Sequence, residues 1–233
     1  MDNRSLRIGI DVGGTFTHAV AVEQPGNRLV AHAVTPTTHA GSESVSRGII
    51  TVFREIMAQT KAEPREVCFV AHSTTQATNA LLEGDVAKVG IVGMGKGLEA
   101  LKAKYDTRIK RLELSPGKFL QTAHVFLNSS IKEFTEEKIA DAVLYLKKSG
   151  CRVIVASEAF GVDNDVCEKA VSACALENKL PAAAACEISQ LYGLKVRTRT
   201  AVINASILPK MTSTADITDE SIKKSGISVP LMI

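Results

Sequence analysis

The first residues with clear chemical potential form a glycine turn near the N-terminus. Asp11 ends a predicted strand, Gly13 and Gly14 form the turn, and Thr15 and Thr17 follow it in the segment IGIDVGGTFT. Glycines can adopt positive φ, so that successive backbone N–H groups converge on phosphate oxygens. The threonine hydroxyls can donate to the same oxygens. The pattern predicts a polyphosphate-binding loop, and the alternative is an ordinary Gly-Gly hairpin turn.

The carboxylate of Asp11 is expected to act on a metal ion or on water, because it repels phosphate. It can hold Mg²⁺ through water against the phosphates, or orient an attacking water. The loop lacks the spacing of a P-loop, and a strand rather than a helix follows it, which excludes a Rossmann turn. It resembles the first phosphate loop of the superfamily that contains actin, sugar kinases and the 70-kDa heat-shock chaperones. ATP and Mg²⁺ are therefore the expected ligands.

A second polar segment follows a predicted strand and opens a predicted helix. A helix N-terminus offers N–H donors to an anion or an oxyanion, and His72 is available there for proton transfer. Thr74 and Thr75 are expected to face substrate or phosphate, and Asn79 is a further candidate for substrate contact. The alternative is that one of these threonines caps the helix and that Asn79 braces a loop.

Two later segments lie at the ends of predicted strands, where functional groups often occur. Glu158 follows an apolar strand, at the position where open α/β sheets place functional groups, although the segment favours a purely structural interpretation, a helix cap at Asp163 or Asn164. The stretch 93–97, GMGKG, does not match the glycine spacing of a dinucleotide fingerprint, so we expect only a strand-to-helix turn there.

The pattern of apolar residues predicts the elements that position these groups. Three β-rich runs at the N-terminus predict an antiparallel meander, and apolar residues at helical spacing between 45 and 56 predict a helix packed on it. Strands and helices then alternate, which predicts an α/β fold. The meander is expected at 6–12, 18–22 and 29–34; the later strands at 67–71, 89–92, 125–127, 153–156 and 181–186; the later helices at 77–82, 98–104, 136–148, 166–176 and 200–208, the last ending at Pro209.

Composition excludes several classes of protein. The net charge is only +3, aromatic residues make up 4% and Trp is absent, which argues against nucleic-acid binding. No apolar run approaches the ~20 residues that span a bilayer. The five cysteines include no C-x-x-C pair and are typical of reduced thiols, so a cytoplasmic location is expected.

The least regular stretch, 106–121, is the expected subdomain break, and the strand-like stretch 227–233 suggests a polypeptide that continues.

Two motifs taken together carry a family resemblance. DVGGTFT (11–17) and HSTTQATNALLE (72–83) resemble the signature pair of the hydantoinase/oxoprolinase family, which includes N-methylhydantoinases, 5-oxoprolinases and ATP-dependent ketone carboxylases. Residues 200–205 and 208–209 resemble the segment that opens the family's second region. The resemblance implies an actin/ribonuclease H-like ATPase lobe, with an N-terminal domain over 1–195 and the opening of a second, hydantoinase A-type domain over 196–233.

The same resemblance implies an activity. It is the ATP-dependent opening of a cyclic amide, such as a hydantoin or 5-oxoproline, through a phosphorylated substrate oxygen, with a hydantoinase B-type subunit and oligomer formation as further expectations. This chain alone is expected to be inactive, because the second phosphate loop would lie downstream. His18 stands where the family has Asp, and Ser73 where it has Gly; His18 is therefore a candidate for substrate contact. Ketone carboxylation and an actin-like conformational switch are the alternatives.

Overall fold

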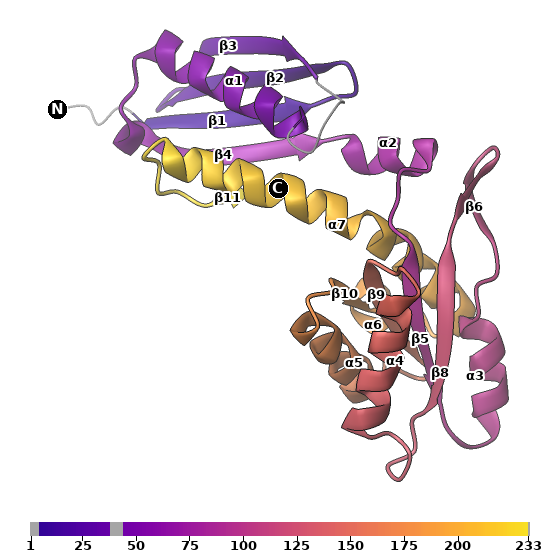
Figure 1. The fold of residues 1–233 in the computed structure, drawn as a ribbon. Coiled ribbons are helices and arrows are strands. Elements are labelled where there is room, and N and C mark those ends of the chain that lie inside the picture. Colours follow the sequence, from indigo (N-terminus) through magenta and orange to yellow (C-terminus); the bar gives the residue numbers. More distant parts are fainter. Residues whose placement is uncertain (1–4, 38–43, 233) are drawn as a thin grey trace. The chain divides into compact units, whose positions relative to one another are not determined.

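The computed structural model describes residues 5–37 and 44–232, with the side chains of 44–46, 74 and 221 outside that description. The chain is a mixed α/β protein with two compact units (Figure 1). Unit 1 takes residues 1–79 and 211–233, and unit 2 takes residues 80–210. Unit 2 is thus inserted into the sequence of unit 1.

Unit 1 contains a five-stranded sheet of order β11-β4-β1-β2-β3. The first three strands form the expected antiparallel meander, whereas β4 runs parallel to β1 and β11 runs parallel to β4. The β1–β4 pairing therefore brings the carboxyl ends of two strands to the same edge. The strands are β1 (Ser5–Val12), β2 (Phe16–Gln24), β3 (Arg28–Pro36), β4 (Val67–Thr74) and β11 (Leu231–Met232).

One face of this sheet carries the core of unit 1. Side chains alternate along β1, so that Ile8, Ile10 and Val12 are buried while Arg7 and Asp11 are exposed. The buried face packs on α1 (Ser44–Thr60), as the helical spacing predicts. Ile227, which follows the last helix of the chain, α7 (Leu194–Lys224), belongs to the same cluster. A short 3-10 helix, η1 (Pro64–Glu66), leads into β4.

Unit 2 contains a four-stranded parallel sheet of order β10-β9-β5-β8 and a separate hairpin of β6 and β7. The chain leaves β5 toward β8 on one side, then crosses back over β5 to continue through β9 and β10 on the other. The strands are β5 (Val89–Gly95), β6 (Leu112–Ser115), β7 (Lys118–Leu120), β8 (Thr122–Asn128), β9 (Val153–Glu158) and β10 (Ala182–Ala184).

Helices cover both faces of the unit 2 sheet, which explains why β5 and β9 are buried along their whole length. One face packs on α4 (Glu136–Lys148) and α5 (Val166–Glu177). The other packs on the first part of α7 (Leu194–Lys224) and on α3 (Ala100–Thr107). The remaining helices are α2 (Gln76–Glu83), η2 (Gly97–Glu99) and α6 (Ala185–Ile188).

The glycines of the GMGKG stretch serve this packing. A Cβ on Gly93 would collide with the side chain of Thr107, and a Cβ on Gly95 would lie 2.7 Å from the Cβ of Ala103. Both Thr107 and Ala103 belong to α3, so the glycines let that helix approach β5 closely. The structure agrees with the expected strand-to-helix turn, which continues through η2.

The helix predicted to stop at Pro209 continues through it. α7 runs from Leu194 to Lys224, so this prediction was wrong. Proline removes one helical N–H, but residues on both sides are held by packing, with Ala205 in the core of unit 2 and Ile222 in that of unit 1. The missing N–H would have donated to the carbonyl of Ala205. The carbonyl of Ser206, the next residue, accepts the backbone N–H of Ala87 at 2.8 Å, which ties this part of the helix to the segment before β5.

Two further predictions differ from the structure. The strand expected over 181–186 is limited to β10, because the chain turns into α6 at Ala185. The irregular stretch 106–121 lies within unit 2 and forms the β6–β7 hairpin, whereas the units divide between residues 79 and 80 and between 210 and 211. Within the described ranges, no helix is long and apolar enough to cross a membrane.

Glu168 links three elements at the carboxyl end of the unit 2 sheet. Its fully buried carboxylate accepts the backbone N–H of Glu158 and that of Cys186, each at 2.8 Å. It thereby joins α5 to the end of β9 and to α6.

We predict that Glu168→Ala lowers the free energy of unfolding by about 2–4 kcal/mol, because two buried N–H groups lose their acceptors. Urea denaturation followed by circular dichroism measures the effect. The exposed Glu177 on the same helix is the matched control, and Glu177→Ala is expected to change stability by less than about 0.5 kcal/mol. Equal effects of the two substitutions would contradict this role of Glu168.

Candidate functional site

The face of the unit 1 sheet opposite its core carries the candidate carboxylate. Asp11 is exposed there, beside His18 of β2 and Ser73 of β4, its two partners in the strand register. These residues border a hollow of about 360 Å³ over the sheet, which Met232 also lines. The structure therefore brings together Asp11 and His18, which the sequence analysis named separately as candidates, and it adds Ser73 to them.

The Gly13-Gly14 turn is tight, but its glycines are not needed for positive φ, so that part of the prediction was wrong. The N–H of Gly13 donates to the carbonyl of Phe16 at 3.0 Å. A Cβ on Gly13 would lie 3.1 Å from this carbonyl oxygen, and a Cβ on Gly14 would lie 3.1 Å from the Nδ2 of Asn79. Glycine is required here for close approach rather than for a left-handed backbone.

A threonine outside the motif braces the turn. The hydroxyl of Thr37 donates to the carbonyl of Gly13 at 2.9 Å, and its N–H donates to the carbonyl of Thr15 at 2.8 Å. The hydroxyl of Thr17, which is fully buried, lies 3.0 Å from that of Thr37. Because the single hydroxyl proton of Thr37 goes to Gly13, Thr17 donates to Thr37. Thr17 thus supports the turn from below, whereas Thr15 is exposed.

The start of α2 lies next to this turn. The backbone N–H of Thr75 donates to the carbonyl of Val12 at 3.2 Å, so the end of β1 is bonded to the residue that precedes the helix. Thr75 is exposed, and its carbonyl accepts the N–H of Asn79. Asn79 lies with its amide against Gly14, as a brace between helix and turn. A turn and a helix N-terminus that meet in this way favour binding of an anion.

His72 lies on the other face of the sheet from Asp11. It pairs in register with Ile10 and is buried, with an exposed fraction of 4%. Neither ring nitrogen has a hydrogen-bond partner within the described part of the chain. Burial lowers the pKa of His72 below its ordinary value of 6.5, and the negative charge of Asp11 acts in the opposite direction. The ring is therefore neutral near pH 7.

The remaining predicted residues fall outside this group. The side chain of Thr74 lies outside the described part of the structure. Glu158 belongs to unit 2, at the end of β9, where Asn164 accepts the N–H of Val166 at the start of α5. The sequence analysis missed Thr37, which belongs to no motif. Its position after the β-rich run at 29–34 was the available signal.

The group around Asp11 fits a phosphate ligand with Mg²⁺. Among the described residues, no cluster of three or more metal-ligating side chains occurs. Mg²⁺ does not need one, because it keeps several waters and is held by one or two carboxylates together with substrate phosphates. A single exposed carboxylate beside the Gly13-Gly14 turn is a suitable donor set.

Comparison with known proteins identifies the family of the chain. The family model of the hydantoinase/oxoprolinase N-terminal region matches residues 7–178, which include both motifs. The chain belongs to this family. It is 26% identical over 247 residues to the caprolactamase subunit alpha of Pseudomonas jessenii, covering 99% of this chain and 35% of that protein.

Solved structures show the same fold. The ATP-dependent caprolactamase of Pseudomonas jessenii matches with a TM-score of 0.62 and 21% identity over 97% of this chain. Nucleotide-free acetone carboxylase matches with a TM-score of 0.65 and 18% identity over 96%. This chain spans 35% of each of those chains.

The brace beneath the turn can be tested by removing one hydroxyl. We predict that Thr37→Val destabilises the protein by about 1–2 kcal/mol, because the Gly13 carbonyl and the Thr17 hydroxyl both lose their partner. Urea denaturation measures this loss. Thr51→Val, which removes an exposed hydroxyl on α1, is the matched control, and a Thr37→Val variant as stable as that control would contradict the brace.

The burial of His72 predicts a pH dependence of stability. Its pKa is lower in the folded than in the unfolded protein, so the unfolded state binds more protons just below pH 6.5. Its contribution is present above pH 6.5 and is lost as pH falls through the folded pKa. Unfolding free energies measured from pH 7.5 down to 5 should fall more steeply in the wild type than in His72→Leu. Parallel profiles would show that His72 is not buried in the neutral form.

Proposed function

We propose that this chain is the N-terminal part of an ATP-dependent enzyme that opens cyclic amides of the hydantoin or 5-oxoproline type. The observation that carries the proposal is the junction of the Gly13-Gly14 turn with the start of α2, next to Asp11, in a member of this family. The order β11-β4-β1-β2-β3, a meander followed by parallel strands, supports an actin/ribonuclease H-like lobe. The domain boundary near residue 195 stays part of the proposal.

In this proposal the turn binds the phosphates of ATP. Thr15 can donate its exposed hydroxyl to them, as can N–H groups at the start of α2, while Thr17 and Thr37 fix the turn. Asp11 would hold Mg²⁺ through water, and the ion would neutralise charge on the transferred phosphoryl group. Asn79 positions Gly14 rather than the substrate.

The reaction consists of a phosphoryl transfer followed by hydrolysis. The amide oxygen of the substrate attacks the terminal phosphorus of ATP, the bridging P–O bond breaks, and ADP leaves. Water then adds to the activated carbon, and the ring C–N bond breaks as the nitrogen takes up a proton, which leaves an acyl phosphate. A second water hydrolyses this acyl phosphate to the carboxylate and releases phosphate. His18 and Ser73 border the hollow beside Asp11 and can contact the substrate there. Proton transfer by His72 would require its ring to leave the buried face.

Carboxylation of a ketone is the second candidate. It is favoured by the likeness to acetone carboxylase, since the same phosphorylation on a ketone enolate oxygen would activate that substrate. The name of the caprolactamase relative, a subunit alpha, supports a second, B-type subunit as partner. Activity of the whole enzyme is proposed for the assembled protein, of which this chain is one part.

We predict that Asp11→Asn reduces Mg²⁺-dependent phosphate release from ATP by about a hundredfold, because the variant loses the charge that holds the ion. The measurement is phosphate release by the polypeptide that carries this chain, together with its partner subunit, with and without a hydantoin, 5-oxoproline or a lactam. Release that rises with the cyclic amide in the wild type supports the hydrolase.

The control is the same substitution at a carboxylate away from the glycine turn. Asp165 is partly exposed and pairs with Lys169 in unit 2, so Asp165→Asn should leave phosphate release unchanged. Stimulation by acetone and bicarbonate but by no cyclic amide would favour the carboxylase. ATP hydrolysis that responds to neither class of substrate would refute both and favour a conformational switch.

A further inference from the structure

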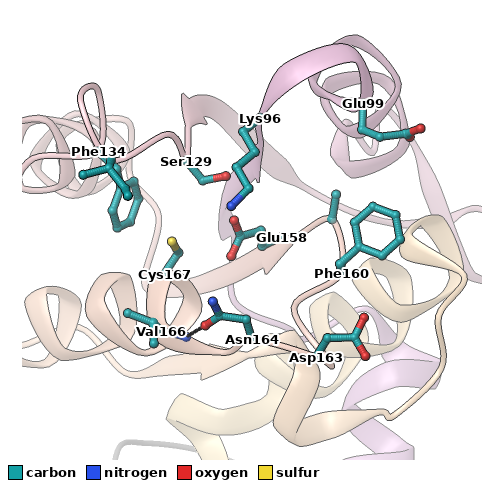
Figure 2. A pocket seen from close by; sticks show the side chains of 12 residues that line it. Lys96, Glu99, Ser129, Phe134, Glu158, Phe160, Asp163, Asn164, Val166 and Cys167 are labelled. Carbon is teal, nitrogen blue, oxygen red and sulfur yellow. Dashed lines mark hydrogen bonds between the residues drawn. The ribbon is translucent and has the colours of Figure 1, made fainter.

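Unit 2 contains a cavity of about 590 Å³ at the carboxyl edge of its parallel sheet (Figure 2). The strand order turns at β5, because the chain proceeds from β5 to β8 on one side and to β9 on the other. Open α/β sheets bind ligands in the crevice at this switch point. The cavity takes Lys96 from the end of β5, Ser129 from the end of β8, Glu158 from the end of β9 and Cys167 from the start of α5.

Polar groups of these four residues converge at the floor of the cavity. Glu158 and Ser129 are each only 7% exposed. The hydroxyl of Ser129 has no well-formed hydrogen bond within the described residues, although the Glu158 carboxyl group lies beside it. Figure 2 shows the ammonium group of Lys96 directed toward the same carboxyl group. No ion pair between Lys96 and Glu158 occurs among the described contacts.

The surroundings of Glu158 raise the pKa of its carboxyl group above the ordinary value, which makes protonation easier. Burial raises its pKa most, and the negative charge of Glu168 raises it further, against the opposing effects of Ser129, Cys167 and Lys96. Cys167 is itself a neutral thiol, because burial and the nearby carboxylates raise its pKa to about 11. A neutral carboxyl group presents an O–H donor and a C=O acceptor side by side.

The charged and apolar residues that line the cavity restrict the charge and polarity of its ligand. The carboxylates of Glu99 and Asp163 lie at the cavity, while Lys96 is its single cationic lining residue, so the charges disfavour an anionic ligand. Four large apolar side chains also line the cavity and suit a ligand with an apolar part. They are Ile131, Phe134, Phe160 and Val166.

A ring of small size holds its amide bond cis, which places the N–H and the C=O on the same side. Such an amide matches a neutral carboxyl group through two parallel hydrogen bonds. An open-chain secondary amide is trans, with N–H and C=O on opposite sides, and can form only one of the two. The distinction is geometric and does not depend on the reaction that follows.

We propose that the unit 2 cavity is the recognition site for the cyclic amide, with the Glu158 carboxyl group pairing to the cis-amide and Ser129 and Lys96 placed to donate to its carbonyl oxygen. This inference rests on the proposed function for the identity of the ligand, and it assigns the substrate class to residues that the nucleotide loop does not include. Glu158 is then a binding residue, and Phe134 and Phe160 contact the ring methylenes.

The test compares two neutral amides with this chain, in the absence of ATP. Titration calorimetry or ligand-observed NMR would measure the affinity for δ-valerolactam, whose amide is cis, and for N-ethylpropanamide, which has the same number of carbons and a trans amide. We expect the lactam to bind about tenfold more tightly, which corresponds to one additional hydrogen bond. Equal affinity for the two amides would overturn the pairing.

Variants of Glu158 separate pairing from general packing. Glu158→Leu should abolish the preference for the lactam, whereas Glu158→Gln should retain it, because a carboxamide also presents a donor and an acceptor. Wild-type affinity should decrease as pH rises through the raised pKa of Glu158, while that of Glu158→Gln should stay constant. Glu177→Gln on the exposed side of α5 is the matched control. Circular dichroism and urea denaturation confirm that each variant is folded.

The outcomes distinguish this site from the proposed function. Lactam binding that Glu158→Leu leaves intact would overturn the site, even if lactam stimulates phosphate release. Selective binding that depends on Glu158, without any lactam-stimulated phosphate release by the assembled protein, would support the site and contradict the hydrolase.

Discussion

Both candidate sites depend on the geometry of parallel strands, whose carboxyl ends meet at one edge of a sheet. In unit 1 the pairing of β1 with β4 brings the Gly13-Gly14 turn against the start of α2. In unit 2 the pairing of β5 with β8 and β9 brings Lys96, Ser129 and Glu158 around one cavity. Residues separated by more than 60 positions in sequence meet because backbone hydrogen bonds fix the register.

The two sites hold their polar groups in opposite ways. Asp11 is exposed to solvent beside the glycine turn, whereas Glu158 is enclosed, and burial raises the pKa of its carboxyl group. Glu168 stabilises the second environment, because its carboxylate accepts the backbone N–H of Glu158, although Glu168 does not itself line the cavity. The fully buried Arg197 also donates to the carbonyl of Glu158, so both backbone groups of that residue are held.

The sequence was sufficient to predict what depends on local pattern. The meander, the helix 136–148 and the glycine turn each follow from residue type and spacing within a short window. It was insufficient where long-range pairing decides: the side of the sheet that His72 occupies follows from its register with Ile10, and the brace at Thr37 follows from a return of the chain after β3. Pro209 was misjudged because local propensity is weaker than packing at both ends of α7.

The interleaved layout of the two units has a consequence for biosynthesis. All residues of unit 2 are contiguous, so every contact within it becomes available once position 210 has left the ribosome. Unit 1 is different, since β11 and the core residues Ile222 and Ile227 are translated only after unit 2. While unit 2 is being translated, the edge of β4 that pairs with β11 has no partner strand. The pairing of β4 with β11 joins residues near 70 to residues near 231, a long separation in sequence. The Gly13-Gly14 turn, which is translated before unit 2, therefore gains its complete sheet only after unit 2 has been translated.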